Sequence, residues 1–201
     1  MVPRRRRARA LSEVDVYEVE LAPREASSLS DDERERAARM TRPEPWIAAR
    51  VALRTVLGER LGVAPAELTF AASEHGKPEL PGSSVRFNLA HSGNRALIAV
   101  ADVEVGVDVE RLERSSRAIE RTLTDGERAG LGPDRHVELM RIWCRKEALA
   151  KAIGGGLGWA PENFDTSRPD GFALIDLELD EGYVGALAVA GERCLLTRHR
   201  R

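Results

Sequence analysis

The sequence predicts an α+β fold, because stretches with the periodicity of strands and stretches with that of helices both occur along the chain. Residues 14–21 and 103–110 alternate apolar and polar side chains, as half-buried strands do. Residues 46–61 instead place apolar side chains three or four positions apart, which is the spacing of an amphipathic helix. The 201 residues can form one domain or two small ones, and no apolar run reaches the length of about 20 residues that crosses a bilayer.

The first half is predicted to hold two helices after the opening strand 14–21. Ser30 can cap a helix, and the acids that follow it favour the positive end of the helix dipole, so one helix begins there and ends before Pro43. The helix over 46–61 ends at Gly62, because glycine readily adopts the left-handed conformation found after helices. Further strands are predicted over residues 68–71, 85–89, 95–100 and 103–110, with a turn at Gly76-Lys77-Pro78 and a loop over 90–94.

The second half is predicted to contain a helix that begins near Thr124 and a long helix over 138–153 that ends in glycines. Residues 172–179 and 183–189 form a closing hairpin, and both ends of the chain are expected to be frayed. The valines of strand 103–110 share one face, which is expected to look into a core.

Charge and cysteine content exclude several classes of protein. The 31 basic and 33 acidic residues give a net charge of −2, which provides no overall field for holding nucleic acid. Cys144 and Cys194 are too few for a disulfide framework, and the basic start of the chain is not followed by an apolar stretch like that of a signal peptide. We therefore expect a soluble, cytoplasmic protein that does not bind a membrane.

Lysine is rare in this chain: Lys77, Lys146 and Lys151 are the only lysines among the 31 basic residues. Lysine can give up a proton and arginine effectively cannot, so these positions are candidates for more than a fixed charge. All three lie in segments that hold other candidate residues.

Two acids on one strand form the first candidate site. The alternation of strand 103–110 places Asp108 and Glu110 on the same face, where their carboxylates repel each other unless a cation joins them. A hard divalent ion such as Mg²⁺ suits such oxygen ligands. Gly106 on the same face leaves room for a ligand to approach the backbone. The alternative is a strand face whose charges simply meet water.

The long helix carries the second candidate site. Trp143, Glu147 and Lys151 are spaced four residues apart and so share one stripe of the helix. Glu147 and Lys151 alone could be an ordinary surface ion pair, worth about 0.2 to 0.5 kcal/mol. The large apolar Trp143 on the same stripe indicates that this face meets protein or a ligand.

Weaker signals come from the first half. His91 is either a hydrogen-bonding loop residue or a contact to phosphate, and the turn at Gly76-Lys77-Pro78 is of a common kind. Arg50 and Arg54 could offer a basic ridge to an anion or be solvated surface residues. The glycines at 154–158 follow a helix, so neither a dinucleotide fingerprint nor a P-loop is present, and zinc spacings and a nucleophile elbow are also missing. Metal-bound carboxylates acting on a phosphate remain.

Together these segments resemble one enzyme family. Gly76-Lys77-Pro78, residues 87–92, residues 105–110 and residues 143–151 with Gly156-Leu157 follow one another as in the 4′-phosphopantetheinyl transferase superfamily. The chain is most similar to its broad-specificity, two-lobed class, which is named for the surfactin synthetase activator. The resemblance extends over about residues 14–189.

The resemblance implies two similar lobes in a pseudo-twofold arrangement, 1–102 and 103–201, each a small, mostly antiparallel sheet with packed helices. It also implies that coenzyme A binds between the lobes. The activity implied is transfer of the 4′-phosphopantetheine arm of coenzyme A to a serine hydroxyl of an apo carrier protein, with release of adenosine 3′,5′-bisphosphate.

Roles for individual residues follow from the same resemblance. Asp108, Glu110 and Glu147 would hold Mg²⁺, with Mn²⁺ as an alternative, against the pyrophosphate. Glu147 would also take the proton of the serine, and Lys151 would protonate or screen the leaving bisphosphate. The residues expected to bind coenzyme A are Arg50, Gly76, Lys77, Pro78, Ala90 and His91. Ala90 departs from the family pattern, because a serine usually stands there.

The expected partners are coenzyme A and an acyl or peptidyl carrier protein, and the chain is expected to be a monomer. Residues 111–136 would face the carrier, with Leu123 and Leu131 as apolar contacts. The arginine-rich residues 4–9 match nothing in the family and could meet an acidic carrier or form an arm. Two alternatives stay open: a binding module for the carrier or coenzyme A without turnover, and a nucleic-acid binder that uses this arm.

Overall fold

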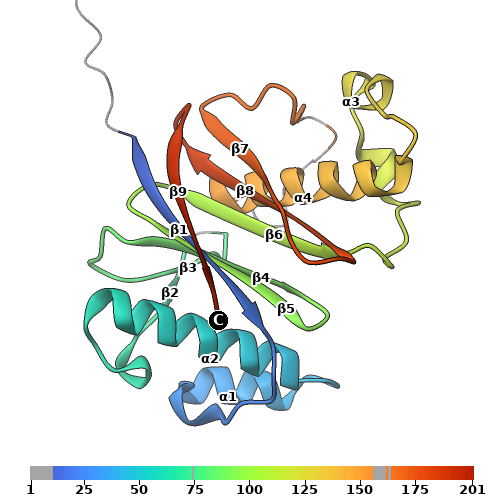
Figure 1. The fold of residues 1–201 in the computed structure, drawn as a ribbon. Helices are drawn as coiled ribbons and strands as arrows, with labels where there is room; N and C mark the ends of the chain where they lie inside the picture. The colour runs from blue at the N-terminus through green and yellow to red at the C-terminus, as the bar shows by residue number, and fades with distance from the viewer. Residues whose placement is uncertain (1–10, 74, 156–161, 163) are drawn as a thin grey trace, which may run out of the picture.

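A computed structural model describes residues 11–73, 75–155, 162 and 164–201, and Figure 1 shows its arrangement. A first sheet has the strand order β4-β5-β1-β9, and a second has the order β6-β8-β7. All neighbours in these sheets are antiparallel except β1 and β9, which are parallel. The strands are β1 (Ser12–Glu20), β4 (Arg86–Ser92), β5 (Arg95–Ala101), β6 (Val105–Arg111), β7 (Phe172–Leu177), β8 (Tyr183–Ala190) and β9 (Cys194–Arg200), with β2 (Ala71–Ala72) and β3 (Pro78–Glu79) forming a separate pair.

The helices cover the outer faces of the two sheets, which confirms the predicted α+β class (Figure 1). Helix α2 packs on the first sheet and α4 on the second. The helices are α1 (Asp31–Ala38), α2 (Glu44–Leu61), α3 (Asp125–Ala129) and α4 (Arg135–Ile153), and short 3₁₀ turns lie at Ala26–Ser28, Pro65–Glu67 and Ile119–Thr122.

Local sequence explains where the helices begin and end. The Ser30 side chain accepts a hydrogen bond from Glu33 N, and the Glu33 carboxylate accepts one from Ser30 N, which forms a capping box. Thr124 and Glu127 cap α3 in the same way. Helix α2 ends at Gly62, whose φ of 69° lies in the left-handed region as predicted.

Three apolar clusters fill the spaces between four layers: α2, the first sheet, the second sheet and α4. The middle cluster joins Val16 and Leu97 of the first sheet to Val107 and Leu187 of the second. The predicted apolar face of β6 is confirmed there, because Val105, Val107 and Val109 are all buried in this cluster. The opposite face of β6 is therefore turned toward α4.

Two predictions for the first half are wrong. The expected loop 90–94 is a turn at residues 93–94, because β4 continues to Ser92. The strand extends beyond the predicted end because its pairing with β5 continues to Ser92, and Ala90 is buried in the cluster between the sheets. The expected strand 68–71 is also wrong: a 3₁₀ turn over Pro65–Glu67 precedes it, and the strand is Ala71–Ala72.

The expectation of a frayed C-terminal end is wrong as well. Residues Cys194–Arg200 form β9, which pairs with β1 in a parallel register that sets Val16 opposite Arg198. The first sheet thus contains a strand from each end of the described chain. The predicted boundary at residue 102 falls between β5 and β6. The division into 1–102 and 103–201 and the pseudo-twofold relation stay predictions.

The helices of the described part of the chain include none that is both long enough and apolar enough to span a membrane.

Candidate functional site

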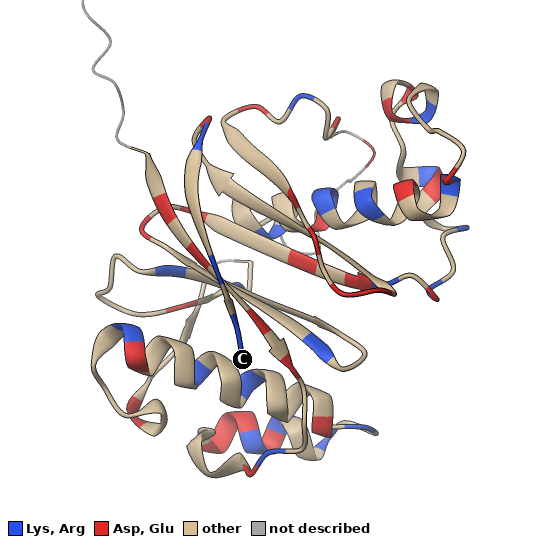
Figure 2. Cartoon of the chain, viewed as in Figure 1, with Lys and Arg blue, Asp and Glu red and all other residues tan. Residues whose placement is uncertain are grey.

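Helix α4 lies directly on β6 because Gly106 has no side chain. A Cβ atom at Gly106 would stand 2.0 Å from Ala148 O and 2.5 Å from Ala152 N of the helix backbone. The sequence analysis expected this glycine to make room for a ligand. The structure corrects that expectation, because the helix backbone takes the space. The close packing brings α4 side chains onto the acidic face of β6, where Figure 2 shows acidic positions beside basic positions of the helix.

Asp108 lies at the centre of this contact and is 6% exposed. Lys151 Nζ donates to Asp108 Oδ1 at 2.6 Å and to the carbonyl oxygen of Val107 at 3.3 Å. The second carboxylate oxygen, Oδ2, is buried and has no hydrogen-bond partner within the described residues. Burial raises the pKa of Asp108, while the Lys151 ammonium and the Cys144 thiol act in the opposite direction.

Glu110 is two residues further along the same face and has different partners. Its Oε2 accepts from Ser92 Oγ at 3.3 Å, and its Oε1 accepts from Trp143 Nε1 at 3.3 Å. The Arg114 guanidinium forms an ion pair with the same Oε1. Both oxygens of Glu110 are therefore engaged, unlike those of Asp108.

Glu147 completes what we call the carboxylate set, which consists of Asp108, Glu110 and Glu147. Burial raises the pKa of Glu147, and the negative charge of Asp108 raises it further. The cations Lys151 and Arg114 partly offset these effects. The predicted stripe of α4 is thus confirmed as a stripe that faces protein, because Glu147 and Lys151 interact with Asp108 and Trp143 with Glu110.

The carboxylate set offers the right atoms for a hard divalent cation. Three carboxylates provide oxygen ligands, and Asp108 Oδ2 is buried without a partner among the residues described. In the present arrangement Lys151 and Arg114 provide the positive charge. The described residues contain no group of three or more His, Cys, Asp or Glu side chains already placed to hold a metal ion.

A pocket of about 470 Å³ between α1, α2 and the β2–β3 pair contains three of the six predicted coenzyme A contacts, Arg50, Gly76 and Pro78. Glu33 pairs with both Arg50 and Arg54, each at 2.7 Å. The Arg50 guanidinium also lies over the rings of Trp46 and Phe70, at 5.8 and 5.2 Å. The pocket therefore combines positive charge with flat aromatic surfaces.

Lys77 does not line that pocket. Its Nζ donates to Glu104 Oε2 at 2.9 Å and to the carbonyl oxygen of Val105 at 3.1 Å. Arg86 Nε binds the other oxygen of Glu104 at 2.8 Å. In this structure Lys77 joins the turn before β3 to the start of β6.

Ala90 and His91 lie on opposite faces of β4. Ala90 is buried between the sheets, so its side chain faces the core. His91 keeps an exposed surface, but the protein around it removes part of the water from its ring. This desolvation, together with the charge of Lys151, lowers the pKa of His91. His91 is therefore the predicted coenzyme A contact that lies within electrostatic reach of the carboxylate set.

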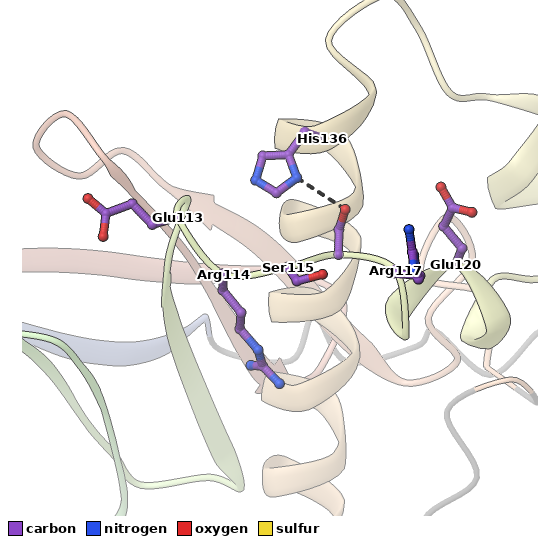
Figure 3. Close-up of a pocket in the computed structure, with 7 residues that line it drawn as sticks. Glu113, Arg114, Ser115, Arg117, Glu120 and His136 are labelled. Carbon is purple, nitrogen blue, oxygen red and sulfur yellow. Dashed lines mark hydrogen bonds between the residues drawn. The ribbon is translucent and has the colours of Figure 1, made fainter.

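A second pocket, of about 390 Å³, lies in the segment after β6 (Figure 3). His136 Nδ1 is 3.1 Å from Ser116 Oγ at its wall. Leu123, predicted as an apolar contact for a carrier, is buried with Leu139 and Ile142, so its side chain is not available at the surface in this structure. The pocket is lined by Glu113, Arg114, Ser115, Ser116, Arg117, Glu120 and His136.

Sequence reasoning missed two residues that organise these sites. Glu33 fits a capping box, and the sequence gives no sign that it also binds two arginines of α2. Arg114 stands four residues after Glu110, which is a pairing distance on a helix, but a turn that follows a strand brings the two together here. The pocket residues Arg36, Trp46 and Phe70 were not singled out either.

Comparisons with known proteins show the class of protein to which this fold and its carboxylate set belong. The model of the 4′-phosphopantetheinyl transferase superfamily matches residues 104–192, a range that contains β6, α3, α4, β7 and the whole of β8. The chain is 34% identical to 4′-phosphopantetheinyl transferase HetI of a Nostoc strain, over 83% of this chain and 80% of that protein.

Other relatives are similarly named. The chain is 32% identical to 4′-phosphopantetheinyl transferase AcpT of Escherichia coli K12, over 77% of this chain and 80% of that protein. It is 27% identical to a 4′-phosphopantetheinyl transferase of Bacillus subtilis, over 78% of this chain and 74% of that protein. The chain therefore belongs to the 4′-phosphopantetheinyl transferase superfamily, and the predictions of this family and of an enzyme are confirmed.

Proposed function

We propose that this enzyme moves the 4′-phosphopantetheine arm of coenzyme A onto a serine hydroxyl of an apo carrier protein and releases adenosine 3′,5′-bisphosphate. The observation that carries the proposal is the buried Asp108, whose Oδ2 has no partner in the described chain while Glu147 and Lys151 interact with the same carboxylate. Membership of the family supports the transfer of a phosphopantetheine group.

Asp108, Glu110 and Glu147 are the residues that would hold Mg²⁺, or Mn²⁺ in its place. When bound, such an ion neutralises the charge that gathers on the pyrophosphate as it is cleaved. The raised pKa values of Asp108 and Glu147 support this assignment, because a buried and a half-buried carboxylate that lack enough positive charge nearby favour their neutral forms.

Glu147 acts as the general base in this proposal. The serine oxygen forms a bond to the phosphorus that carries the pantetheine arm, and the serine proton passes to Glu147 directly or through water. The bond from that phosphorus to the bridging oxygen breaks, and its electron pair leaves with the bisphosphate. A raised pKa brings the carboxylate closer to the range in which it can accept a proton efficiently.

Lys151 is the residue that protonates or screens the departing bisphosphate. Its ammonium is already fixed on Asp108 Oδ1, so it needs no large movement to face a phosphate beside that carboxylate. Lysine suits this role because it can donate a proton as well as supply charge.

The Arg50 pocket takes the adenine end of coenzyme A in the same proposal. Its arginines suit a phosphate, and Trp46 and Phe70 suit a purine ring. His91, close to Lys151, would reach the 3′-phosphate side, and Ala90 would contribute backbone only. Lys77 would have to exchange Glu104 for phosphate.

We also propose where the carrier and coenzyme A bind, that the enzyme is a monomer, and where in the cell it acts. The segment 111–136 with its pocket would face the carrier, coenzyme A would lie between lobes 1–102 and 103–201, and the enzyme would act as a monomer. Cys144 and Cys194 are both free thiols, which supports a reducing, cytoplasmic location.

The experiment is incubation of the purified chain with coenzyme A, Mg²⁺ and a panel of apo carrier proteins, read by the intact mass of each carrier. We expect a gain of one phosphopantetheine on at least one carrier, and no gain when chelator replaces Mg²⁺. Binding of carrier or coenzyme A without any gain in mass across the panel would instead support a binding module that has lost turnover.

A further inference from the structure

Arg114 places a second cation at the carboxylate set: it pairs with Glu110, whereas Lys151 pairs with Asp108. It follows β6 in a turn closed by a hydrogen bond from Arg114 N to Arg111 O at 3.1 Å. This turn directs the guanidinium back to Glu110 Oε1, and Figure 3 shows the side chain reaching from the turn toward α4.

Several contacts fix Arg114 in this position. Its guanidinium lies 5.5 Å from the centre of the Trp143 ring, and Trp143 Nε1 donates to the same Glu110 oxygen that Arg114 binds. The positive charge of Arg114 also acts on Asp108 and Glu147, and it lowers the pKa of each against the larger effect of burial. Arg114 therefore interacts with all three carboxylates.

The two cations of the site differ in their freedom to leave it. The Lys151 side chain is 28% exposed, lies between β6 and α4, and also donates to the carbonyl oxygen of Val107. The Arg114 side chain is 47% exposed and borders the pocket of about 390 Å³, so it can swing outward without disturbing the core. Of these two cations, Arg114 is the one that can be displaced.

We propose that Arg114 is a positioning residue, an internal counterion that holds Glu110 in place and competes with a divalent cation for its carboxylate. A cation that binds Glu110 Oε1 must displace the guanidinium, because both need the same oxygen. This inference rests on the proposed metal binding by Asp108, Glu110 and Glu147.

Titration of the full chain with Mn²⁺ alone, followed by the electron paramagnetic resonance signal of free Mn²⁺, tests the competition. We expect Arg114→Gln to bind Mn²⁺ about three- to tenfold more tightly than the unchanged chain, since it frees Glu110 and removes positive charge from all three carboxylates. Arg114→Lys keeps the charge and should stay within about twofold of the unchanged chain.

Arg117→Gln is the matched control, because Arg117 lines the same pocket and makes no ion pair within the described residues. It should leave Mn²⁺ affinity unchanged. Thermal unfolding of each variant shows that it is folded, and a purely structural role of Arg114 would alter stability without tightening Mn²⁺ binding.

Equal or weaker Mn²⁺ binding by Arg114→Gln overturns the inference. If Asp108→Asn still abolishes binding in that case, the proposed metal site stands and only the role of Arg114 fails. If neither the unchanged chain nor Arg114→Gln binds Mn²⁺, both the metal site and the competition are rejected.

Discussion

Helix α4 presents two lysines to two buried carboxylates, and the pairs are built in opposite ways. Lys146 Nζ lies 2.9 Å from Glu127 Oε2, and the two side chains are 0% and 2% exposed. Lys151 Nζ lies 2.6 Å from Asp108 Oδ1, with 28% and 8% exposed. Both lysines belong to the stretch of nine residues, 143–151, that the sequence singled out, yet only Lys151 pairs with a member of the carboxylate set.

The difference lies in what surrounds each carboxylate. Glu127 Oε1 accepts from Thr166 N and Thr166 Oγ1 at 3.0 and 2.8 Å, and Oε2 accepts from Thr124 N at 3.0 Å. Burial raises the pKa of Glu127, but these hydrogen bonds and Lys146 outweigh it and the net pKa is lowered. Asp108 keeps an unpartnered oxygen in the described structure and a raised pKa. A fully satisfied pair stabilises the fold, and an unsatisfied one leaves capacity for a ligand.

The largest effect is expected from removal of charge at the unsatisfied pair. Asp108→Asn and Glu147→Gln should each lower the rate of arm transfer by about 10³-fold or more, because they remove a metal ligand and, for Glu147, the base. The measurement is the initial rate of mass gain on a carrier. Asp102→Asn, which changes an exposed acid outside the set, should transfer at the normal rate. Full activity of either site variant would remove the proposed mechanism.

The satisfied pair should instead govern stability. Lys146→Met leaves Glu127 charged and buried, so it should lower the free energy of unfolding by about 3–5 kcal/mol, measured by urea denaturation. Lys151→Met should cost less, because the pKa of Asp108 is already raised by burial and its carboxyl can take up a proton instead of staying charged. An equal loss at the two lysines would break the comparison. The double variant Lys146→Met with Glu127→Leu should recover most of the loss.

Lys151→Arg separates charge from proton donation at the unsatisfied pair. The guanidinium keeps the charge beside Asp108 but cannot release a proton, so kcat should fall by about 10²-fold if Lys151 protonates the leaving group. The measurement is kcat for arm transfer together with the KM for coenzyme A, which should change little. An almost unchanged kcat would show that screening of the bisphosphate is sufficient.

The pH dependence of stability should carry opposite signs at the two carboxylates. Because folding raises the pKa of Asp108, ionisation of this carboxyl lowers the folding stability. The loss is complete above the pKa in the folded state, and it disappears as the pH falls below the pKa in the unfolded chain. Folding lowers the pKa of Glu127, so its ionised form contributes stability at pH values above its pKa in the unfolded chain. This stability is lost as the pH falls through the pKa in the folded state.

Asp108→Asn should therefore raise the free energy of unfolding at neutral pH, with a gain that shrinks toward acid. Glu127→Gln should lower it at neutral pH, with a loss that also shrinks toward acid. Urea denaturation at a series of pH values measures both, and the same sign for the two variants would contradict the assignment.

The sequence predicted which side chains share a face of each element at the site. It did not predict which element packs against that face. Alternation placed Asp108 and Glu110 together, and four-residue spacing placed Glu147 with Lys151, because both patterns are local. The contact between the face of β6 and the face of α4 is a long-range tertiary contact, and only the resemblance to a family indicated it. Gly106 was placed on the correct face, but its role in helix packing depends on α4, some 40 residues later in the chain.

Long-range pairing explains the other errors. Strand β9 was missed because residues 194–200 include two arginines and a histidine, and because they pair with β1, which is far away along the chain. Lys77 was grouped with Arg50, but its partner Glu104 is 27 residues away along the chain. No local pattern contains either pairing.

The position of β9 in the first sheet also affects how the chain folds during its synthesis. The ribosome delivers β9 only after β7 and β8, although its partner β1 precedes the other described strands. Until then one edge of β1 stays open, and open strand edges are where unfinished chains associate wrongly. The time taken to synthesise the second sheet thus sets how long the nascent first sheet is at risk of aggregation.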